Sequence, residues 1–206
     1  MPLLQLKYNR RVTTTLFQTT GLLICAYILG SLSSAIILSR LMGFTDPRSD
    51  GSHNPGATNV LRIAGKKAAF FTLTGDFLKG LIPVLIARWL SLDDWVAALT
   101  GLCAFLGHCY PLFFRFKGGK GVATSMAATL AFDWITGLIV IAVWLLFAKV
   151  FKISSLAAIA AFSALPALVF WSSSDYPVTA IFGLISSILI WRHRGNIQRL
   201  INGTEA

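Results

Sequence analysis

The chain has 206 residues, of which 55% are hydrophobic and only 13% are charged, and its mean hydropathy is +0.71. Soluble domains carry charge on roughly 25% of their residues, so this composition excludes an ordinary soluble globular protein. The formal net charge of +10 would suit nucleic acid or anionic lipid as a partner, and its placement along the chain decides which. The cysteines lie in apolar runs without metal-ligand spacing, which argues against both a disulfide framework and a zinc site.

Apolar runs follow one another along the chain, at about 21–43, 68–90, 96–114, 122–150, 156–172 and 177–192. Several come close to the ~20 residues that cross a hydrocarbon core of ~30 Å. Because they leave little chain for a soluble domain, we predict one integral membrane domain over 1–206, with a basic extension at 1–20 and a cytoplasmic tail at 193–206. A basic N-terminus before an apolar run is also typical of a secretory signal. The runs that follow favour a first membrane helix at 21–43 instead.

Basic residues gather in connecting segments, around 48–67, 115–120, 149–152 and 192–199, and acidic residues fall in the turns between them. The positive-inside rule then puts the N-terminus outside and the C-terminus in the cytoplasm. The run 122–150 must therefore turn near Asp133, so that 122–132 forms a short helix beginning inside the membrane. Irregular backbone at that depth predicts a polar cavity open to the cytoplasm. The predicted fold class is all-α, a polytopic integral membrane protein of about seven transmembrane helices, some of them short.

The first polar motif is GSHNPGATN at 51–59, followed by Arg62. Its glycines and proline predict a turn, and short polar side chains suited to capping the next helix come from Ser52, Asn54, Thr58 and Asn59. A helix N-terminus with free N–H groups, and an arginine four residues after Thr58 on the same face, would form a phosphate site. From this motif alone, an ordinary loop with a helix cap is an equally good interpretation.

The second motif is KGGKG at 117–121, directly before the predicted short helix. Glycine lets the backbone approach a ligand closely, and successive N–H groups beside the Lys120 ammonium attract an oxyanion. The segment does not match the G-x-x-x-x-G-K-[ST] pattern of a nucleotide-binding loop, because Gly121 follows the lysine. A flexible cytoplasmic turn is the alternative. The short helix would leave such a turn partly buried and in need of a ligand.

The third motif is the tail RHRGNIQRL, in which His193 and Asn196 share one helical face. A histidine beside an amide suits proton handling or substrate orientation. A basic helix at the lipid surface is the plainer interpretation of this motif alone.

Further polar residues lie within or beside the apolar runs. Asp76 and Lys79 indicate either function or an i, i+3 salt bridge, because ionisable groups inside a membrane are costly unless paired. His108 is predicted to lie at a helix end with a backbone partner. Ser154 and Ser155 predict a helix N-cap that could also face the cavity.

Together these motifs resemble the bacterial acyl-phosphate-dependent glycerol-3-phosphate acyltransferases, the PlsY family. The similarity runs over nearly the whole chain, from GSLSSAI at 30–36 through GSHNPGATNVLRIAGKK, GDFLKG, GHCYPLFFRFKGGKGVAT and SSL to RHRGNIQRL and GTE. Any one of these motifs is weak evidence, but the three main motifs in this order and spacing are highly specific.

The resemblance implies a multi-pass enzyme of the bacterial cell inner membrane. Such an enzyme transfers a fatty acyl group from acyl phosphate to the 1-hydroxyl of sn-glycerol 3-phosphate, giving lysophosphatidic acid and inorganic phosphate for phospholipid synthesis. It implies membrane lipid as the surroundings, no nucleic acid partner, no cofactor and no metal. We expect a monomer.

Carried over by position, the resemblance also implies the site residues. The catalytic candidates are Ser52, Lys120, His193 and Asn196. The substrate-binding candidates are Arg48, Asn54, Thr58, Asn59, Arg62, Gly118, Gly119, Gly121, Ser154 and Ser155. Glu205 is implied to be structural. Where the family usually reads G-S-G-N, this chain has His53 in place of the second glycine.

The chemistry of the residues agrees with these implications. Two phosphate-bearing substrates call for arginine, lysine, amides and hydroxyls with few carboxylates nearby. We hypothesise direct acyl transfer, with a substrate phosphate or His193 as general base and Ser52 orienting the reacting groups. A covalent acyl-Ser52 intermediate is the rival mechanism. The alternative function is a membrane transporter of a phosphorylated metabolite, which an inverted repeat would favour, and we find none in the sequence.

Overall fold

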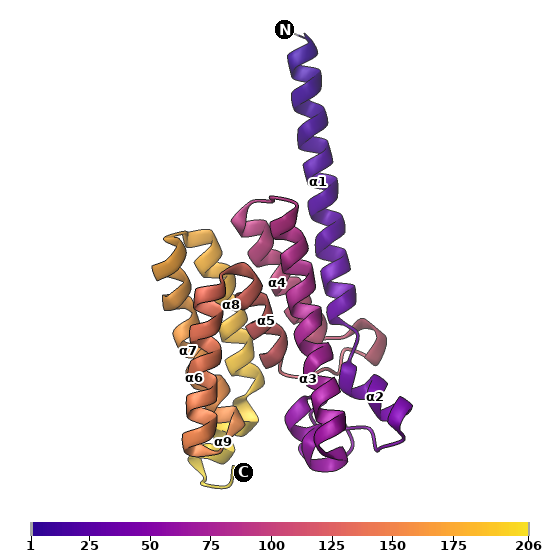
Figure 1. Cartoon of the computed structure of the whole chain (residues 1–206), viewed down its shortest axis with the longest axis vertical. Helices are drawn as coiled ribbons and strands as arrows, with labels where there is room; N and C mark the ends of the chain where they lie inside the picture. The colour runs from indigo at the N-terminus through magenta and orange to yellow at the C-terminus, as the bar shows by residue number, and fades with distance from the viewer. Residues whose placement is uncertain (1, 206) are drawn as a thin grey trace.

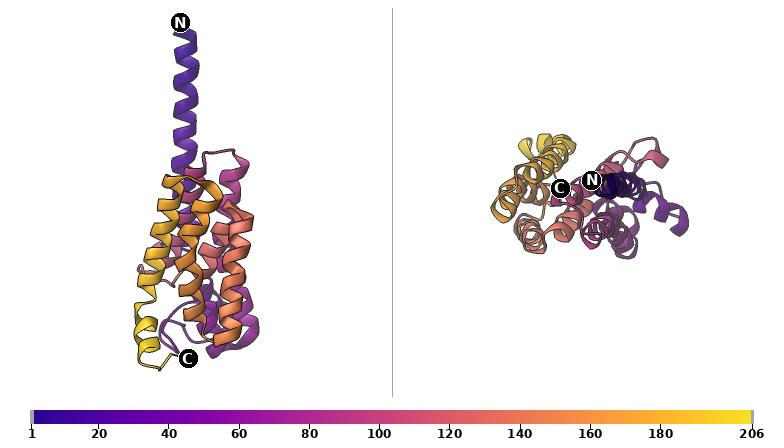
Figure 2. Two further views of the ribbon diagram at one scale, coloured as in Figure 1. Left: turned by 90° about the vertical axis from the view of Figure 1, so that its left-hand side faces the viewer. Right: turned by 90° about the horizontal axis from the view of Figure 1, so that it is seen from above.

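The computed structural model describes the backbone of residues 2–205 and the side chains of residues 16–205. Its elements are α1 Pro2–Gly30, α2 Ser34–Met42, α3 Ala57–Trp89, α4 Asp94–Cys109, the 3₁₀ helix η1 Leu112–Phe114, α5 Val122–Phe132, α6 Trp134–Phe151, α7 Ser154–Ser173, α8 Tyr176–Arg192 and α9 Arg194–Ile201. The prediction of an all-α fold is confirmed, since no strand occurs between residues 2 and 205. The N- and C-termini lie at opposite ends of the long axis, and α1 projects beyond the other helices (Figures 1 and 2).

Four helical segments are long and apolar enough to cross a membrane: Ala57–Trp89, Asp94–Phe114, Trp134–Phe151 and Ser154–Ser173. A fifth candidate is the pair Leu16–Gly30 and Ser34–Met42, which is bent by 43°. Two further apolar helices, α5 and α8, are shorter than a full span. The predicted basic extension at 1–20 falls on α1, where side chains before residue 16 lie outside the described part.

The prediction of one continuous helix over 21–43 is wrong, because the helix breaks between α1 and α2. Ser31 donates both its N–H and its hydroxyl to the Tyr27 carbonyl, at 2.9 and 2.8 Å. A serine that bonds back to the preceding turn often bends a helix. The Leu32 carbonyl accepts a hydrogen bond from Lys79 of α3 at 3.1 Å. A side chain from another helix thus satisfies a backbone carbonyl at the break.

The predicted break at Asp133 is confirmed. Helix α5 ends at Phe132 and α6 begins at Trp134. The Asp133 carboxylate caps α6 by accepting from the N–H groups of Ile135 and Thr136, at 3.2 and 3.3 Å. An aspartate N-cap satisfies N–H groups that would otherwise have no partner at a helix start, so this residue both ends one helix and begins the next.

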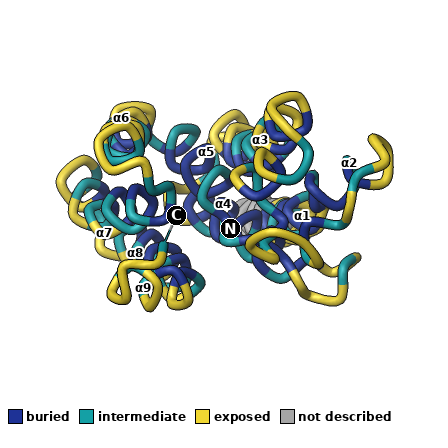
Figure 3. Tube along the Cα trace, turned by 90° about the horizontal axis from the view of Figure 1, so that it is seen from below, coloured by how far each residue is buried: buried dark blue, intermediate teal, exposed yellow. Residues whose placement is uncertain are grey.

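Close contacts between helices occur at glycines. A Cβ on Gly80 of α3 would lie 2.1 Å from the Thr124 carbonyl of α5, and one on Gly30 of α1 would lie 2.2 Å from the Ala104 carbonyl of α4. In lipid, helix association depends on close packing because the surroundings are as apolar as the side chains. Seen from below, α4 and α5 are largely buried between the other helices, whose outer faces are exposed (Figure 3). This packing places α5 against α3, α4 and α6.

Candidate active site

The second and third motifs meet at Lys120 and Asn196. The Lys120 Nζ donates to Asn196 Oδ1 at 2.5 Å, across 76 residues of sequence. Burial, and to a lesser extent the positive charges of Arg199, Arg192 and Arg62, lower the pKa of Lys120 to about 8 against the opposing effect of Glu205. Arg62 belongs to the first motif, so all three motifs contribute to the electrostatic surroundings of this ammonium. The start of α3 and helix α9 lie at the same end of the molecule as the C-terminus (Figure 1).

Glu205 holds this cluster together. Its Oε1 accepts from Asn196 Nδ2 at 2.5 Å and from Ser155 Oγ at 2.7 Å, and its Oε2 accepts from Arg199 Nε at 2.6 Å. An ionised carboxylate only accepts and an ammonium only donates. The Asn196 amide therefore turns its N–H₂ to Glu205 and its oxygen to Lys120. Burial raises the pKa of Glu205, but these hydrogen bonds outweigh that effect and hold it below its usual value.

His193 is buried at the junction of α8 and α9. Its Nδ1 lies 2.8 Å from the Leu189 carbonyl. Because a carbonyl only accepts, Nδ1 carries the proton and Nε2 presents a lone pair in the neutral ring. Burial lowers the pKa of His193 to about 4, against the opposing effect of that hydrogen bond, and the charge of Lys120 adds to the lowering. The ring is therefore neutral at pH 7 and accepts through Nε2.

The glycine loop, residues 118–121, is held from two sides. Arg192 Nη2 donates to the carbonyls of Gly118 and Gly119 at 2.7 and 2.9 Å, and the Gly119 N–H donates to the His108 carbonyl at 3.2 Å. The expectation that successive loop N–H groups face an oxyanion is therefore wrong for Gly119, whose N–H already has a protein partner. Apart from its charge, nothing in the sequence pointed to this role of Arg192.

Gly121 needs to be glycine for a conformational reason. Its φ is +82°, and a Cβ there would lie 2.3 Å from the Phe105 ring. A left-handed φ favours glycine. This turn directs the chain from Lys120 into α5.

Asn59 has a structural role in the first motif. Its Nδ2 donates to the carbonyls of Pro47 and Asp50 at 2.9 and 3.0 Å, and its Oδ1 accepts from the Ser52 N–H at 2.9 Å. Both amide N–H donors are thus used to hold the loop against the start of α3. Asn59 thereby holds the backbone of Ser52, whose side chain is exposed, and direct binding of substrate by Asn59 stays a prediction.

The predicted cap of the helix after the first motif is wrong. Helix α3 begins at Ala57 after Gly56, and over the described residues no side chain caps it. Thr58 is exposed and Asn54 is half-buried, close to the helix start. The first N–H groups of α3 therefore remain without a side-chain cap.

Arg48 ties two loops together. It pairs with Asp46 through Nη2 and Nε, at 2.7 and 3.1 Å, and Nη1 donates to the Phe114 carbonyl at 3.4 Å. The Asp46 hydrogen bonds raise the pKa of Arg48. His53 has a φ of +55°, a conformation that costs a non-glycine residue roughly 1–2 kcal/mol. Its Nδ1 lies 3.3 Å from the Arg48 carbonyl, so the ring that replaces the family's usual glycine contacts the backbone of the same loop.

The predicted N-cap at the start of α7 is also wrong. Ile153 occupies the cap position, and Ser154 is the first helical residue and half-buried. Ser155 is buried and its hydroxyl donates to Glu205, so it faces the cluster as expected but bonds to the protein.

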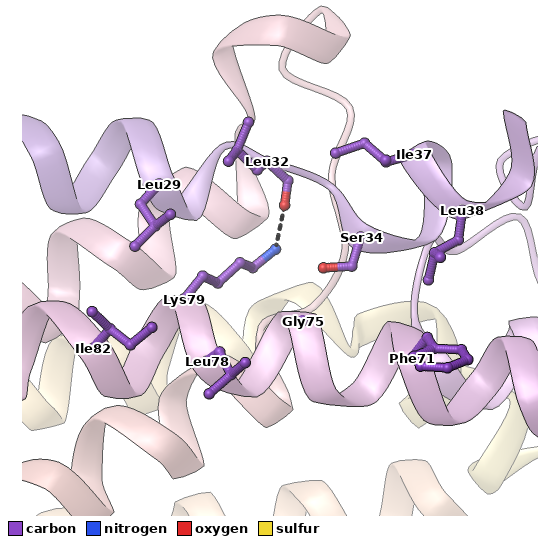
Figure 4. A pocket seen from close by; sticks show the side chains of 10 residues that line it. All are labelled: Leu29, Leu32, Ser34, Ile37, Leu38, Phe71, Gly75, Leu78, Lys79 and Ile82. Atoms are coloured by element: carbon purple, nitrogen blue, oxygen red, sulfur yellow. Dashed lines mark hydrogen bonds between the residues drawn. The ribbon is translucent and has the colours of Figure 1, made fainter. Parts of the chain in front are cut away.

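Asp76 and Lys79 form a buried salt bridge of 2.8 Å, each with 4% of its side chain exposed. Lys79 also lines an apolar groove of about 380 Å³ between α1, α2 and α3, where it reaches the Leu32 carbonyl (Figure 4). The backbone partner predicted for the His108 ring is wrong, because Nδ1 lies 3.2 Å from Thr124 Oγ1 and 3.7 Å from Asp76 Oδ1.

The fold and the site define a polytopic membrane protein with a partly buried cationic site at one end of its helices. The family model of glycerol-3-phosphate acyltransferases matches residues 20–203, and the chain belongs to this family. It is 51% identical over 183 residues to the glycerol-3-phosphate acyltransferase of Methylococcus capsulatus, covering 88% of this chain and 91% of that one. It is 49% identical over 186 residues to the enzyme of Halorhodospira halophila, covering 90% and 94%.

Solved structures give the same result. A crystal structure of PlsY, an integral membrane glycerol 3-phosphate acyltransferase, in its glycerol 3-phosphate form matches with a TM-score of 0.87 and 41% identity. Its lysophosphatidic acid form matches with a TM-score of 0.82 and 40% identity. Each comparison covers 92% of this chain and 94% of the other.

Proposed function

We propose that this protein transfers a fatty acyl group from acyl phosphate to the 1-hydroxyl of glycerol 3-phosphate, releasing lysophosphatidic acid and inorganic phosphate. The observation that carries the proposal is the contact of Lys120 with Asn196, within the electrostatic range of Arg62, Arg192 and Arg199. A half-buried ammonium among arginines attracts phosphate groups, and both substrates carry one. The similarity to PlsY in its glycerol 3-phosphate and lysophosphatidic acid forms supports the same substrate and product here.

The protein then lies in the bacterial inner membrane with its N-terminus outside and its site facing the cytoplasm. The basic segments at 48–67, 115–120 and 192–199 support this orientation under the positive-inside rule. The opposite placement of the chain termini agrees with an odd number of crossings (Figure 1). About seven spans result if α5, α8 and the bent pair α1 and α2 each count as one. A monomer is sufficient, because one chain supplies the whole cluster.

Lys120 and Arg62 bind the substrate phosphates, with Thr58, Asn54 and the uncapped start of α3 beside them. Ser52 orients the reacting groups from the loop that Asn59 and Arg48 hold in place. Ser154 lies next to Ser155 at the edge of the cluster. The glycines 118, 119 and 121 serve binding by fixing the position of Lys120.

Chemically, the glycerol hydroxyl oxygen attacks the acyl carbonyl carbon, and the bond between that carbon and the phosphate oxygen breaks. The phosphate leaves with the electron pair, and the hydroxyl proton passes to a phosphate oxygen. With a pKa of about 4, His193 is a weak base. A phosphate group with a second pKa near 6 is a better proton acceptor. His193 Nε2 then orients the hydroxyl by accepting its hydrogen bond.

Direct transfer is favoured over an acyl-Ser52 intermediate. A serine nucleophile needs a hydrogen-bonded base to activate it. The His193 ring and the Lys120 ammonium bond to Leu189 and Asn196 rather than to the Ser52 hydroxyl, and the Ser52 N–H is held by Asn59. Direct transfer instead relies on placing the two substrates about 3–3.5 Å apart.

The test uses purified protein in detergent or lipid mesophase with acyl phosphate and glycerol 3-phosphate. Phosphate release and lysophosphatidic acid should appear in equal amounts, and only when both substrates are present. A transporter would release no phosphate. Rapid quench with radiolabelled acyl phosphate should leave no label on denatured protein, and label that stays on the wild-type protein but not on Ser52→Ala would establish the acyl-enzyme instead.

A further inference from the structure

We propose that His108 is a positioning residue: its ring is the surface on which Gly119 rests, and it thereby sets the position of Lys120. A Cβ on Gly119 would lie 2.3 Å from His108 Nε2, and 3.1 and 3.2 Å from the neighbouring ring carbons. Real Cβ atoms do not approach other atoms that closely. The structure therefore explains glycine at this position by the histidine ring beneath it, before any ligand is considered.

The ring cannot easily move aside, because a buried polar cluster from three helices holds it. Thr124 Oγ1 of α5 donates to the Asp76 carbonyl of α3 at 2.8 Å. Since that bond uses the hydroxyl proton, Thr124 Oγ1 accepts from His108 Nδ1–H at 3.2 Å. Nε2 then points away from this bond, toward Gly119.

The buried salt bridge of Asp76 and Lys79 on α3 adjoins this cluster. Asp76 Oδ1 lies 3.7 Å from His108 Nδ1 and 2.8 Å from Lys79 Nζ. Ionisable residues at membrane depth are tolerated when they pair in this way. The pair also has a second contact, from Lys79 to the Leu32 carbonyl at the break between α1 and α2 (Figure 4).

The loop is thus fixed between two groups. His108 contributes its ring and its backbone carbonyl on one side, and Arg192 binds the carbonyls of Gly118 and Gly119 on the other. Lys120 is the next residue along the chain. A displacement of Gly119 by a Cβ would carry the Lys120 backbone away from Asn196, and an error of about 1 Å in a site can lower a rate about 100-fold.

A double-mutant cycle tests this inference, with His108→Asn as the second substitution. An asparagine amide can take the place of Nδ1 and keep the bond to Thr124, but it lacks the ring edge that faces Gly119. We expect Gly119→Ala alone to lower kcat/KM by at least about tenfold, which corresponds to about 1.4 kcal/mol. In the His108→Asn background, Gly119→Ala should lower it by no more than about twofold, as coupled neighbours behave.

Gly118→Ala is the matched control. A Cβ on Gly118 would lie 2.1 Å from the His108 carbonyl and 2.5 Å from Pro111 Cδ, which are atoms that His108→Asn leaves in place. Its effect should therefore be the same in both backgrounds. If Gly119→Ala is equally harmful with and without His108, the glycine is required by substrate and the inference is overturned.

The activity readout depends on the proposed function, so the same cycle is also measured by thermal unfolding in detergent. Gly119→Ala should lower the melting temperature in the wild-type background and lower it much less with His108→Asn. A wild-type protein that transfers no acyl group would refute the proposed function. The melting temperatures would still test the contact between the His108 ring and Gly119. If the changes in melting temperature caused by Gly119→Ala and His108→Asn simply add in the double variant, the inference is overturned.

Discussion

Replacing Lys120 by methionine removes the charge at the centre of the site and keeps nearly the same length of side chain. The ammonium has three N–H donors, of which one goes to Asn196. The other N–H donors of the ammonium can therefore bond to a substrate phosphate. A hydrogen bond to a charged group contributes about 1.5–3 kcal/mol, and about 1.4 kcal/mol corresponds to tenfold, so one lost contact lowers kcat/KM by about 10- to 150-fold. If the ammonium also stabilises charge on the departing phosphate, the loss reaches about 10²–10³.

The assay is steady-state phosphate release with each substrate varied in turn. Lys117→Met is the control, because it removes the same charge from an exposed side chain three residues earlier in the same loop. We expect Lys117→Met to stay within about twofold of the wild type, as the substitution of an exposed side chain should. Equal kcat/KM values for Lys120→Met and Lys117→Met would refute the assignment of the phosphate site.

Three more predictions concern the groups around Lys120. Arg192→Met should lower kcat/KM about tenfold, because two loop carbonyls lose a charged donor, whereas Arg194→Met, an exposed neighbour of equal charge, should not. Glu205→Gln should lower the melting temperature. Because folding lowers the pKa of Glu205, its ionised carboxylate stabilises the protein above the unfolded pKa, and this stabilisation is lost as pH falls through the folded pKa. The wild type should therefore lose stability over that pH range, and Glu205→Gln should not. Finally, kcat/KM should fall as pH rises through about 8, where free Lys120 loses its proton, and Lys120→Arg should remove this fall, since arginine stays charged.

Local pattern was enough to predict the elements of the fold that depend on local physics. Apolar length predicted helices throughout, and the charge at Asp133 marked the break between α5 and α6, because an aspartate there caps the second helix. The family resemblance that the three motifs carry implied that Lys120 and Asn196 share one site, and they are hydrogen-bonded.

The errors arise where a residue far along the chain decides the outcome. The break between α1 and α2 lies within the run 21–43 that was predicted as one helix, and part of its support is Lys79, 47 residues away from Leu32. Ser155 and Asn59 looked like helix caps because their side chains suit that role, but tertiary partners hold both. The role of Arg192 could not be predicted from local sequence either, since only the folded chain places it against the glycine loop.

The position of Asn196 between Lys120 and Glu205 gives a last prediction. A direct salt bridge would neutralise the ammonium and keep it from substrate, whereas the amide satisfies both charged partners without adding charge. Asn196→Asp has the same shape but adds a carboxylate that pairs with Lys120, and it repels both Glu205 and a substrate phosphate. We expect kcat/KM to fall at least as far as in Lys120→Met, with a raised KM for glycerol 3-phosphate. Asn202→Asp makes the same change at an exposed position of the tail and should be silent. Wild-type kinetics in Asn196→Asp would show that the neutral amide is not what keeps Lys120 available.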